Sequence, residues 1–459
     1  MSIQRKPLKV LFVASEFPPL QQNVTRTTKF IKYLDRNNCD PHVLTINIKS
    51  MEATDHTFDK EIPADLKIYR AFFPNIFANS QAQHRQYKKE LEHYQTRTNK
   101  LFKCLLWMKI LLRRRIPGVI QNFIWQNILI PDNRMPWIPF AVRKGIKICR
   151  EENIDVIYST APCYSNHIVA WIIKTIMRKK WVADYRDLWT TTLYRNYSTK
   201  WREKLEKGIE KRCLNKMDAI LVVTDTMKAI LLEKFPGINE DKIKIITNGY
   251  DPEDFNNLPD KSSKENFVIS YTGVVYSSYR LDYFLHAIGD LIEEHPSLEK
   301  EISVFIIGNI ESEEKANMIR IIKRRNLGEI ISLEDKIPRA QALEVQRSSS
   351  LLLFHLSPEM TDSGAVSSKL YDYWAAEKPV LALIPPDSLA AQYILKSNSG
   401  CVVDPSDTEA IKNALWNYYQ EFKAASNSYH PNKEFISRFD RRELARQLDD
   451  VFRSISDTK

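Results

Sequence analysis

Three side chains close to predicted strand ends can orient or deprotonate a hydroxyl group. Asp184 and Asp187 flank Arg186 where an apolar run ends, and His167 opens a predicted helix after another such run. A carboxylate or imidazole acts as a general base when it lies within hydrogen-bond reach of the hydroxyl. The competing interpretations are an ion pair between the aspartates and Arg186, and a structural histidine. Asp184, Asp187 and His167 are therefore our catalytic candidates.

A second group of residues can bind a diphosphate. The segment 362–369 precedes a predicted helix over 370–376, and backbone amides at a helix N-terminus attract phosphate. Lys369 lies in the first turn, where its ammonium can pair with phosphate as a point charge. Arg280, seven residues after Gly273, is the second candidate cation. The competing interpretation for both cations is an exposed, solvated side chain.

Composition excludes several classes of protein. The chain has 459 residues, enough for two domains, and only 11 glycines. It contains neither GxGxxG nor GxxxxGK[ST], so a glycine-rich phosphate loop is not expected. The six cysteines form no CxxC pair, and the chain has no DxD. We therefore expect no metal site and no cofactor. Without an apolar leader or a run of about 18 apolar residues, we expect a cytoplasmic protein.

Short apolar runs alternate with helical stretches along the whole chain. Helices are predicted at Arg26–Leu34, Ser165–Lys179 and Trp201–Met217. This βαβ rhythm predicts parallel sheets covered by helices on both faces. The predicted strands are Val10–Ala14, His42–Ile46, Ile68–Ala71, Val156–Thr160, Trp181–Asp184, Ala219–Thr224, Ile243–Thr247, Val268–Thr272, Val304–Ile307, Leu351–Leu356, Val380–Leu383 and Cys401–Val403.

The polar stretch 256–266 divides the strands into two series. We predict two doubly wound α/β domains, over 1–255 and 267–433, that face a cleft. Residues 434–459 are predicted to form one amphipathic helix that can cross back to the first domain. Ligands of such sheets bind beyond the carboxyl ends of the strands.

The net charge of +10 is concentrated in one basic insert at about 82–117. Between Arg85 and Arg115 the sequence has ten Lys or Arg and two Glu, a net charge of +8. A basic helix with Leu, Phe and Trp favours an anionic membrane surface. The alternatives are an internal helix with a solvated basic end and, less favoured, nucleic-acid binding. The predicted membrane-facing residues are Lys103, Trp107, Lys109, Arg113, Arg114 and Arg115.

Several predicted strand-end loops together carry a family resemblance. They are Val10–Pro19 with Arg26, Pro131–Trp137, Asp155–Pro162 with His167, Asp184–Trp189, Thr247–Asp251, Tyr271–Gly273 and Lys369–Val380. In order and spacing the chain resembles GT-B glycosyltransferases of the retaining family 4 (group 1). The resemblance implies sugar transfer from a nucleotide-sugar held by the C-terminal domain to an acceptor held by the N-terminal domain. It also implies that no bound metal is needed.

The resemblance also implies site residues. Those for the donor are Gly273, Arg280, Gly364, Ser367, Lys369, Leu370 and Asp372, the last to bind the ribose hydroxyls. Those in the N-terminal loop near donor or acceptor are Pro19, Gln21, Gln22, Asn23 and Arg26.

The chain departs from the family pattern at two places. The family has two glutamates where this chain has Gly364 and Asp372, and it has glycines in the loop where this chain has Gln21, Gln22 and Asn23. Our first interpretation is a bacterial transferase that extends a surface polysaccharide or lipopolysaccharide on a lipid-linked acceptor, at the inner face of the cytoplasmic membrane. The alternatives are a nucleotide-sugar epimerase of the same fold and a catalytically degenerate GT-B scaffold that binds a partner.

Overall fold

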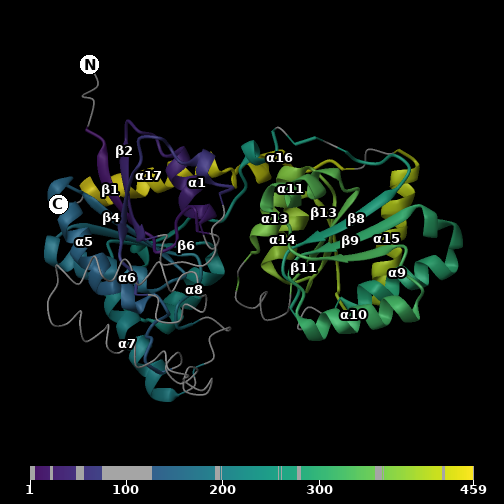
Figure 1. Cartoon of the computed structure of the whole chain (residues 1–459), viewed down its shortest axis with the longest axis horizontal. Coiled ribbons are helices and arrows are strands. Elements are labelled where there is room, and N and C mark those ends of the chain that lie inside the picture. Colours follow the sequence, from purple (N-terminus) through teal and green to yellow (C-terminus); the bar gives the residue numbers. More distant parts are fainter. Residues whose placement is uncertain are drawn as a thin grey trace, which may run out of the picture. The chain divides into compact units, whose positions relative to one another are not determined.

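The computed structural model divides the chain into two compact units (Figure 1). The N-terminal unit comprises Met1–Ile246 and Ala445–Lys459, and the C-terminal unit comprises Thr247–Leu444. The structure describes residues 6–20, 24–47, 56–74, 127–191, 197, 199–256, 258–259, 261–276, 281–356, 364, 366–425 and 429–457. The insert at 82–117 lies outside the described residues.

The N-terminal unit is built on a seven-stranded parallel sheet of order β3-β2-β1-β4-β5-β6-β7. Its strands are β1 (Leu8–Val13), β2 (Cys39–Ile46), β3 (Lys67–Ala71), β4 (Val156–Ala161), β5 (Lys180–Tyr185), β6 (Ala219–Val222) and β7 (Ile243–Ile245). The helices are α1 (Thr25–Tyr33), α5 (Ile138–Glu151), α6 (Ser165–Met177), α7 (Lys200–Lys216) and α8 (Asp225–Lys234). Successive strand residues point to opposite faces, so Leu11 and Val13 pack into the main core while Phe12 faces the other side.

The C-terminal unit has a six-stranded parallel sheet of order β10-β9-β8-β11-β12-β13. Its strands are β8 (Phe267–Thr272), β9 (Ile302–Ile307), β10 (Ile331–Glu334), β11 (Leu351–His355), β12 (Val380–Leu383) and β13 (Gly400–Val403). Its helices are α9 (Asp282–Glu294), α10 (Ser312–Arg324), α11 (Arg339–Ser348), α13 (Ser368–Ala376), α14 (Leu389–Ser397), α15 (Thr408–Lys423) and α16 (Lys433–Ser437).

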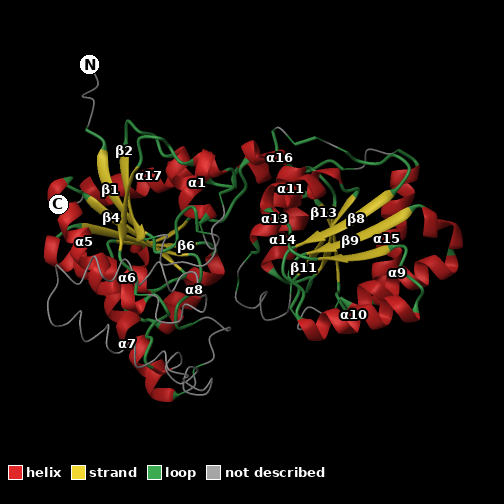
Figure 2. Ribbon diagram, in the orientation of Figure 1, coloured by secondary structure: helices red, strands yellow, loops and turns green. Residues whose placement is uncertain are grey.

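Each face of this second sheet has its own apolar core. One contains residues of α9, α10 and α15, and the other contains residues of α11, α13, α14 and α16. Figure 2 shows the helices on both sides of the strands. The predicted fold class of two doubly wound parallel sheets is confirmed. The sequence analysis missed β10, an edge strand whose pattern Ile-Ser-Leu-Glu is too short and polar to stand out.

The end of the chain corrects one prediction. In place of one helix over 434–459, the described residues form two helices, α16 (Lys433–Ser437) and α17 (Arg441–Asp457). From Ala445 onward, α17 belongs to the N-terminal unit. Phe452 is fully buried there, and its ring centroid lies 6.1 Å from those of Phe12 and Tyr158. Among the residues that the structure describes, no helix is both long and apolar enough to cross a bilayer.

We predict that Phe452→Ala destabilises the N-terminal unit by about 3 kcal/mol or more, because it leaves a cavity beside two aromatic rings. Denaturant unfolding followed at several wavelengths measures the loss. Arg446→Ala is the matched control on the same helix, since its side chain is 63% exposed; its effect should stay within about 0.5 kcal/mol. Equal effects of the two variants would contradict this packing role.

Candidate functional site

A buried ion pair lies at the carboxyl end of β5 in the N-terminal unit. Arg26 of α1 donates from Nε to Asp184 Oδ2 at 2.8 Å and from Nη2 to Oδ1 at 3.1 Å. The side chains are 1% and 0% exposed. Tyr158 of β4 donates its hydroxyl to Asp184 Oδ2 at 2.5 Å, and Arg26 Nη2 also donates to the carbonyl of Ile246. The pair therefore joins α1, two strands and the end of the unit's first chain segment.

This arrangement changes the roles predicted for both residues. Burial alone would raise the pKa of Asp184, but Arg26 and the Tyr158 hydroxyl bring that pKa below its ordinary value. A base must reach the hydroxyl that it deprotonates, and Asp184 has no exposed surface. The acid pairs with Arg26, whereas the sequence analysis considered Arg186. Arg26, predicted near the ligand, is equally buried.

His167 also lies inside the unit. Its ring is fully buried and stacks on Tyr185, with 4.7 Å between the centroids. Nδ1 lies 2.8 Å from the Ser159 hydroxyl, which accepts a hydrogen bond from Trp181. Burial lowers the pKa of His167 to about 3, so the ring is neutral at physiological pH. These contacts support the structural interpretation of this histidine.

Asp187 is the predicted catalytic residue whose side chain is exposed. It lies in the loop after β5, and two buried glutamates of α7 accept hydrogen bonds from this loop. Glu206 accepts from the Trp189 indole at 3.0 Å, and Glu210 accepts from the backbone N–H of Thr190 at 3.0 Å. Both glutamates are fully buried. An exposed carboxylate on a fixed loop at the carboxyl edge of a sheet is suited to orient a hydroxyl.

A second charged cluster that the sequence analysis missed lies at the same edge. Arg134 Nη2 donates to Glu16 Oε1 at 3.0 Å, and both residues are at least nine-tenths buried. Asp132 ties the segment that carries Arg134 to the start of α6, because it accepts hydrogen bonds from the backbone N–H and the hydroxyl of Ser165 at 2.9 and 2.7 Å. Both residues lie inside family-like motifs, Glu16 just after β1 and Arg134 just before α5, so a charged residue within such a motif is the signal in the sequence.

The C-terminal unit gathers its candidate groups around Lys369. This lysine, in the first turn of α13, donates from Nζ to the Tyr271 hydroxyl at 2.5 Å and lies 4.1 Å from the ring centroid. The Tyr271 hydroxyl donates in turn to the carbonyl of Val274 at 2.7 Å. Burial lowers the pKa of Lys369 to about 7. The ammonium is thus held at one place at the end of β8.

Two glycines bring neighbouring loops together beside that lysine. Gly273 follows β8 with φ +144° and Gly308 follows β9 with φ +146°, conformations that other residues rarely adopt. A Cβ on Gly308 would lie 1.8 Å from the carbonyl oxygen of Gly273, and one on Gly273 would lie 3.1 Å from Lys369 Cδ. The two loops therefore pack closely beside Lys369, and the N–H groups of Gly273 and Gly308 donate to the carbonyls of Ile307 and Glu334 at 2.9 and 3.0 Å.

Asp372 has a different neighbour from the one predicted. Arg339 of α11 binds it with both terminal nitrogens, each at 3.1 Å, and also donates to Asp254 at 3.0 Å. The Asp372 side chain is 15% exposed. A carboxylate that accepts a bidentate arginine has fewer lone pairs left for ribose hydroxyls. The sequence analysis did not anticipate Arg339, which lies outside the family-like motifs.

The remaining predicted residues have mixed positions. Leu370 is fully buried in the core, so its side chain packs and does not line the edge. Ser367 caps α13 by accepting from the Lys369 N–H, Gly364 is buried, and Pro19 is half-buried. The predicted residues outside the described part of the chain are Gln21, Gln22, Asn23, Arg280, Lys103, Trp107, Lys109, Arg113, Arg114 and Arg115.

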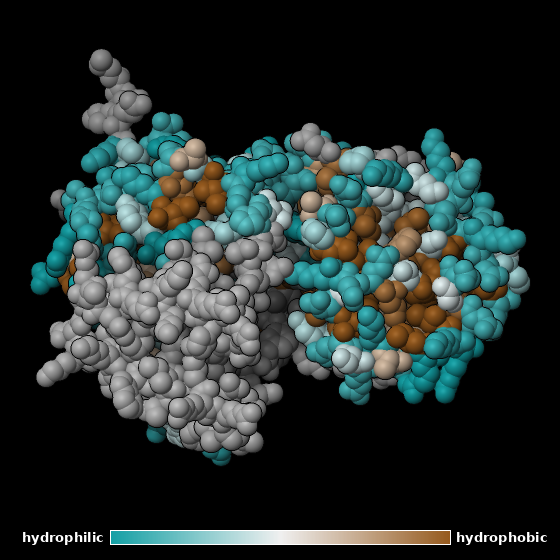
Figure 3. Space-filling view, in the orientation of Figure 1, coloured by the Kyte–Doolittle hydropathy of each residue, from teal (hydrophilic) through white to brown (hydrophobic). Residues whose placement is uncertain are grey.

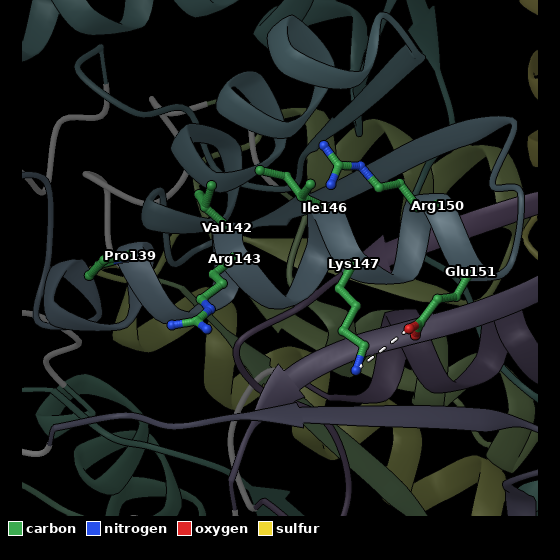
Figure 4. A pocket seen from close by; sticks show the side chains of 7 residues that line it. All are labelled: Pro139, Val142, Arg143, Ile146, Lys147, Arg150 and Glu151. Carbon is green, nitrogen blue, oxygen red and sulfur yellow. Dashed lines mark ion pairs between the residues drawn. The ribbon is translucent and has the colours of Figure 1, made fainter. Parts of the chain in front are cut away.

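A surface groove along α5 lies apart from these groups (Figure 4). All of its lining residues come from this one helix, from Pro139 to Glu151, and Lys147 pairs with Glu151 at 3.5 Å. None of the predicted site residues lines it. A groove made by one helix offers no convergent set of polar groups from several elements, which a substrate site requires.

Comparisons with known proteins support the fold. Residues 111–254 match the model of Glycosyltransferase Family 4. A glycosyltransferase from Rickettsia africae ESF-5 superposes with TM-score 0.61 at 15% identity, covering 99% of this chain and 100% of that one. HepE from Anabaena, solved with UDP and glucose, superposes with TM-score 0.59 at 14% identity, covering 97% of this chain and 100% of that one. WaaG, a glycosyltransferase of lipopolysaccharide biosynthesis, superposes with TM-score 0.54 at 13% identity, covering 97% of this chain and 99% of that one. Comparison with curated protein sequences gives no match. The chain has the GT-B fold, as the resemblance implied.

We predict that Asp184→Leu costs about 3–5 kcal/mol of unfolding free energy, because it leaves the Arg26 cation buried without its partner. The double variant Arg26→Leu/Asp184→Leu should lose less. The wild-type pair has a lowered carboxyl pKa, so its contribution is present at neutral pH and disappears as pH falls below about 3.9. Urea unfolding at several pH values measures all three proteins. A double variant less stable than Asp184→Leu would contradict the pairing.

Proposed function

We propose that this GT-B protein transfers a sugar from a nucleotide-sugar donor to an acceptor hydroxyl. The observation that carries the proposal is the fixed Lys369 ammonium beside Gly273 and Gly308 at the carboxyl edge of the C-terminal sheet. A leaving nucleoside diphosphate is anionic, and a positioned cation stabilises the charge that develops on it. The same edge is the usual ligand position of open parallel sheets.

On the acceptor side, we propose that Asp187 orients the attacking hydroxyl or accepts its proton. It is the exposed member of the three catalytic candidates, whereas Asp184 and His167 are buried. The half-buried Arg186 beside it donates from Nε to the carbonyl of Ala161 at 2.8 Å, which joins the ends of β4 and β5. The predicted retaining outcome remains part of this proposal, and no protein nucleophile is assigned.

The wider biological role is also a proposal. HepE was solved with UDP and glucose and WaaG acts in lipopolysaccharide biosynthesis, which favours a UDP-hexose donor and a bacterial surface glycan as product. We propose a lipid-linked acceptor reached at the inner face of the cytoplasmic membrane, with the basic segment around Arg113–Arg115 contributing. Transfer is proposed to need no divalent cation and should continue in EDTA.

We predict that UDP binds more weakly as pH rises through about 7, because Lys369 loses the proton that makes it a cation. Lys369→Met should bind UDP roughly 10- to 100-fold more weakly, as expected for a lost charge-assisted hydrogen bond. The same variant should show no fall of affinity over this pH range. Titration calorimetry with UDP, GDP, ADP and CMP at several pH values tests this. Unchanged UDP affinity in the variant would remove Lys369 from the donor site.

We predict that Asp187→Asn lowers the transfer rate by about 10²–10⁴-fold, the usual range for losing a general base. Its nucleotide affinity and unfolding free energy should stay unchanged, since the side chain is exposed. The control is Asp155→Asn, an exposed aspartate that precedes β4 at the opposite edge of the sheet. Sugar release from radiolabelled UDP-glucose, with acceptor lipid extract present, measures the rate. A variant as active as the control would exclude this role for Asp187.

A further inference from the structure

Helix α7 has two chemically different faces. Its inner face carries Cys213 and Leu214 together with Glu206 and Glu210, all buried. The two glutamates hold the loop after β5 through Trp189 and Thr190. These acids are therefore turned away from solvent and contribute nothing to the charge of the outer surface.

The outer face is consequently much more basic than the sequence of the helix implies. Six exposed Lys or Arg side chains occur along the helix: Lys200, Lys204, Lys207, Lys211, Arg212 and Lys216. The third glutamate of the helix, Glu203, is bound by Lys207 at 2.6 Å. The acids are thus hidden or paired, while the cations remain at the surface.

Two large apolar side chains lie among these cations. Trp201 is 51% exposed and Leu205 is 43% exposed. With 100° per residue, they share one side of the helix with Lys204, Lys211 and Arg212, opposite Glu206 and Glu210. Arg202 donates to the carbonyl of Leu129, so the 52% exposed Ile128 lies in the chain segment next to the first turn of α7.

We propose that the outer face of α7 is a docking surface for an anionic lipid bilayer. Tryptophan and leucine that enter the headgroup region, flanked by cations that reach anionic headgroups, are the components of an interfacial helix. Its residues belong to a different part of the sequence from the basic segment around Arg113–Arg115. The proposal rests on the membrane location in the proposed function and does not depend on the transfer reaction.

Charge complementarity selects lipid over other occupants. Each exposed cation near an anionic leaflet strengthens binding, and the effect fades within a Debye length, about 10 Å at 0.1 M salt. The α5 groove also carries cations, but its apolar members Val142 and Ile146 pack partly against the core. On α7, by contrast, Trp201 and Leu205 are exposed. The same helix therefore offers both the charge and the insertable side chains.

The test uses the full chain and vesicle flotation. Phosphatidylcholine–phosphatidylglycerol vesicles are compared with pure phosphatidylcholine, at low and high salt. Lys204→Gln/Lys211→Gln should weaken partition onto anionic vesicles about 25-fold at low salt, since each cation is worth roughly fivefold, and much less at high salt. Trp201→Ala/Leu205→Ala should weaken it about tenfold or more at both salt concentrations, because apolar insertion is not screened.

Matched controls come from the C-terminal unit, where exposed apolar residues also occur. Figure 3 shows apolar residues among hydrophilic ones on the visible face of that unit. Ile319 of α10 and Leu395 of α14 are 39% and 60% exposed, and Lys323 and Arg324 are exposed cations of α10. Ile319→Ala/Leu395→Ala and Lys323→Gln/Arg324→Gln should float like the wild type. Thermal melts and UDP titrations confirm that all variants are folded.

Four results would overturn the proposal. If the α7 variants bind vesicles as well as the wild type does, the α7 face is excluded as the docking surface. If neutralising Arg113–Arg115 then abolishes vesicle binding, the proposed membrane location still stands. A wild-type chain that ignores anionic vesicles would exclude both the face and the membrane location, leaving the transferase test with UDP intact. If the chain binds neutral and anionic vesicles equally well, with no dependence on salt, anionic lipid is excluded as the specific ligand of this face. If the wild-type chain self-associates but does not bind vesicles, and the α7 substitutions abolish the self-association, the face is an interface between copies of this chain.

Discussion

Two opposite charges, on Arg26 and Asp184, lie inside the N-terminal unit, and each is stable there only while the other stays in place. Their hydrogen bonds join α1, β4, β5 and the carbonyl of Ile246. The loop that carries the exposed Asp187 begins two residues after Asp184. The ion pair fixes the start of this loop, and Glu206 and Glu210 hold Trp189 and Thr190 further along it. The interaction supports the site without belonging to it.

The two sheet edges use charge in contrasting ways. In the N-terminal unit the strongest charges are buried and neutralised, and a single exposed carboxylate remains in the loop after β5. In the C-terminal unit Lys369 donates to the Tyr271 hydroxyl and lies over the ring of the same residue. A donor anion and an acceptor hydroxyl need these opposite kinds of environment.

The strands could be predicted from the sequence because buried parallel strands are continuous apolar runs, and the motif positions followed because the motifs lie next to those runs in the sequence. The ion-pair partners of the aspartates could not be predicted from the sequence. Asp184 binds Arg26, which is 158 residues away, although Arg186 is nearby in sequence, and Asp372 binds Arg339 of another helix. Burial of His167 and the break between α16 and α17 likewise depend on tertiary packing, which one-dimensional patterns do not record.

The return of α17 to the N-terminal unit has a consequence for biosynthesis. A ribosome synthesises the chain from the N-terminus to the C-terminus, and domains generally fold in that order. Here Phe12 and Tyr158 are covered by Phe452, which is synthesised after the whole C-terminal unit. The unit that starts first therefore completes its core last, and until then its apolar face is exposed to chaperones and to other nascent chains.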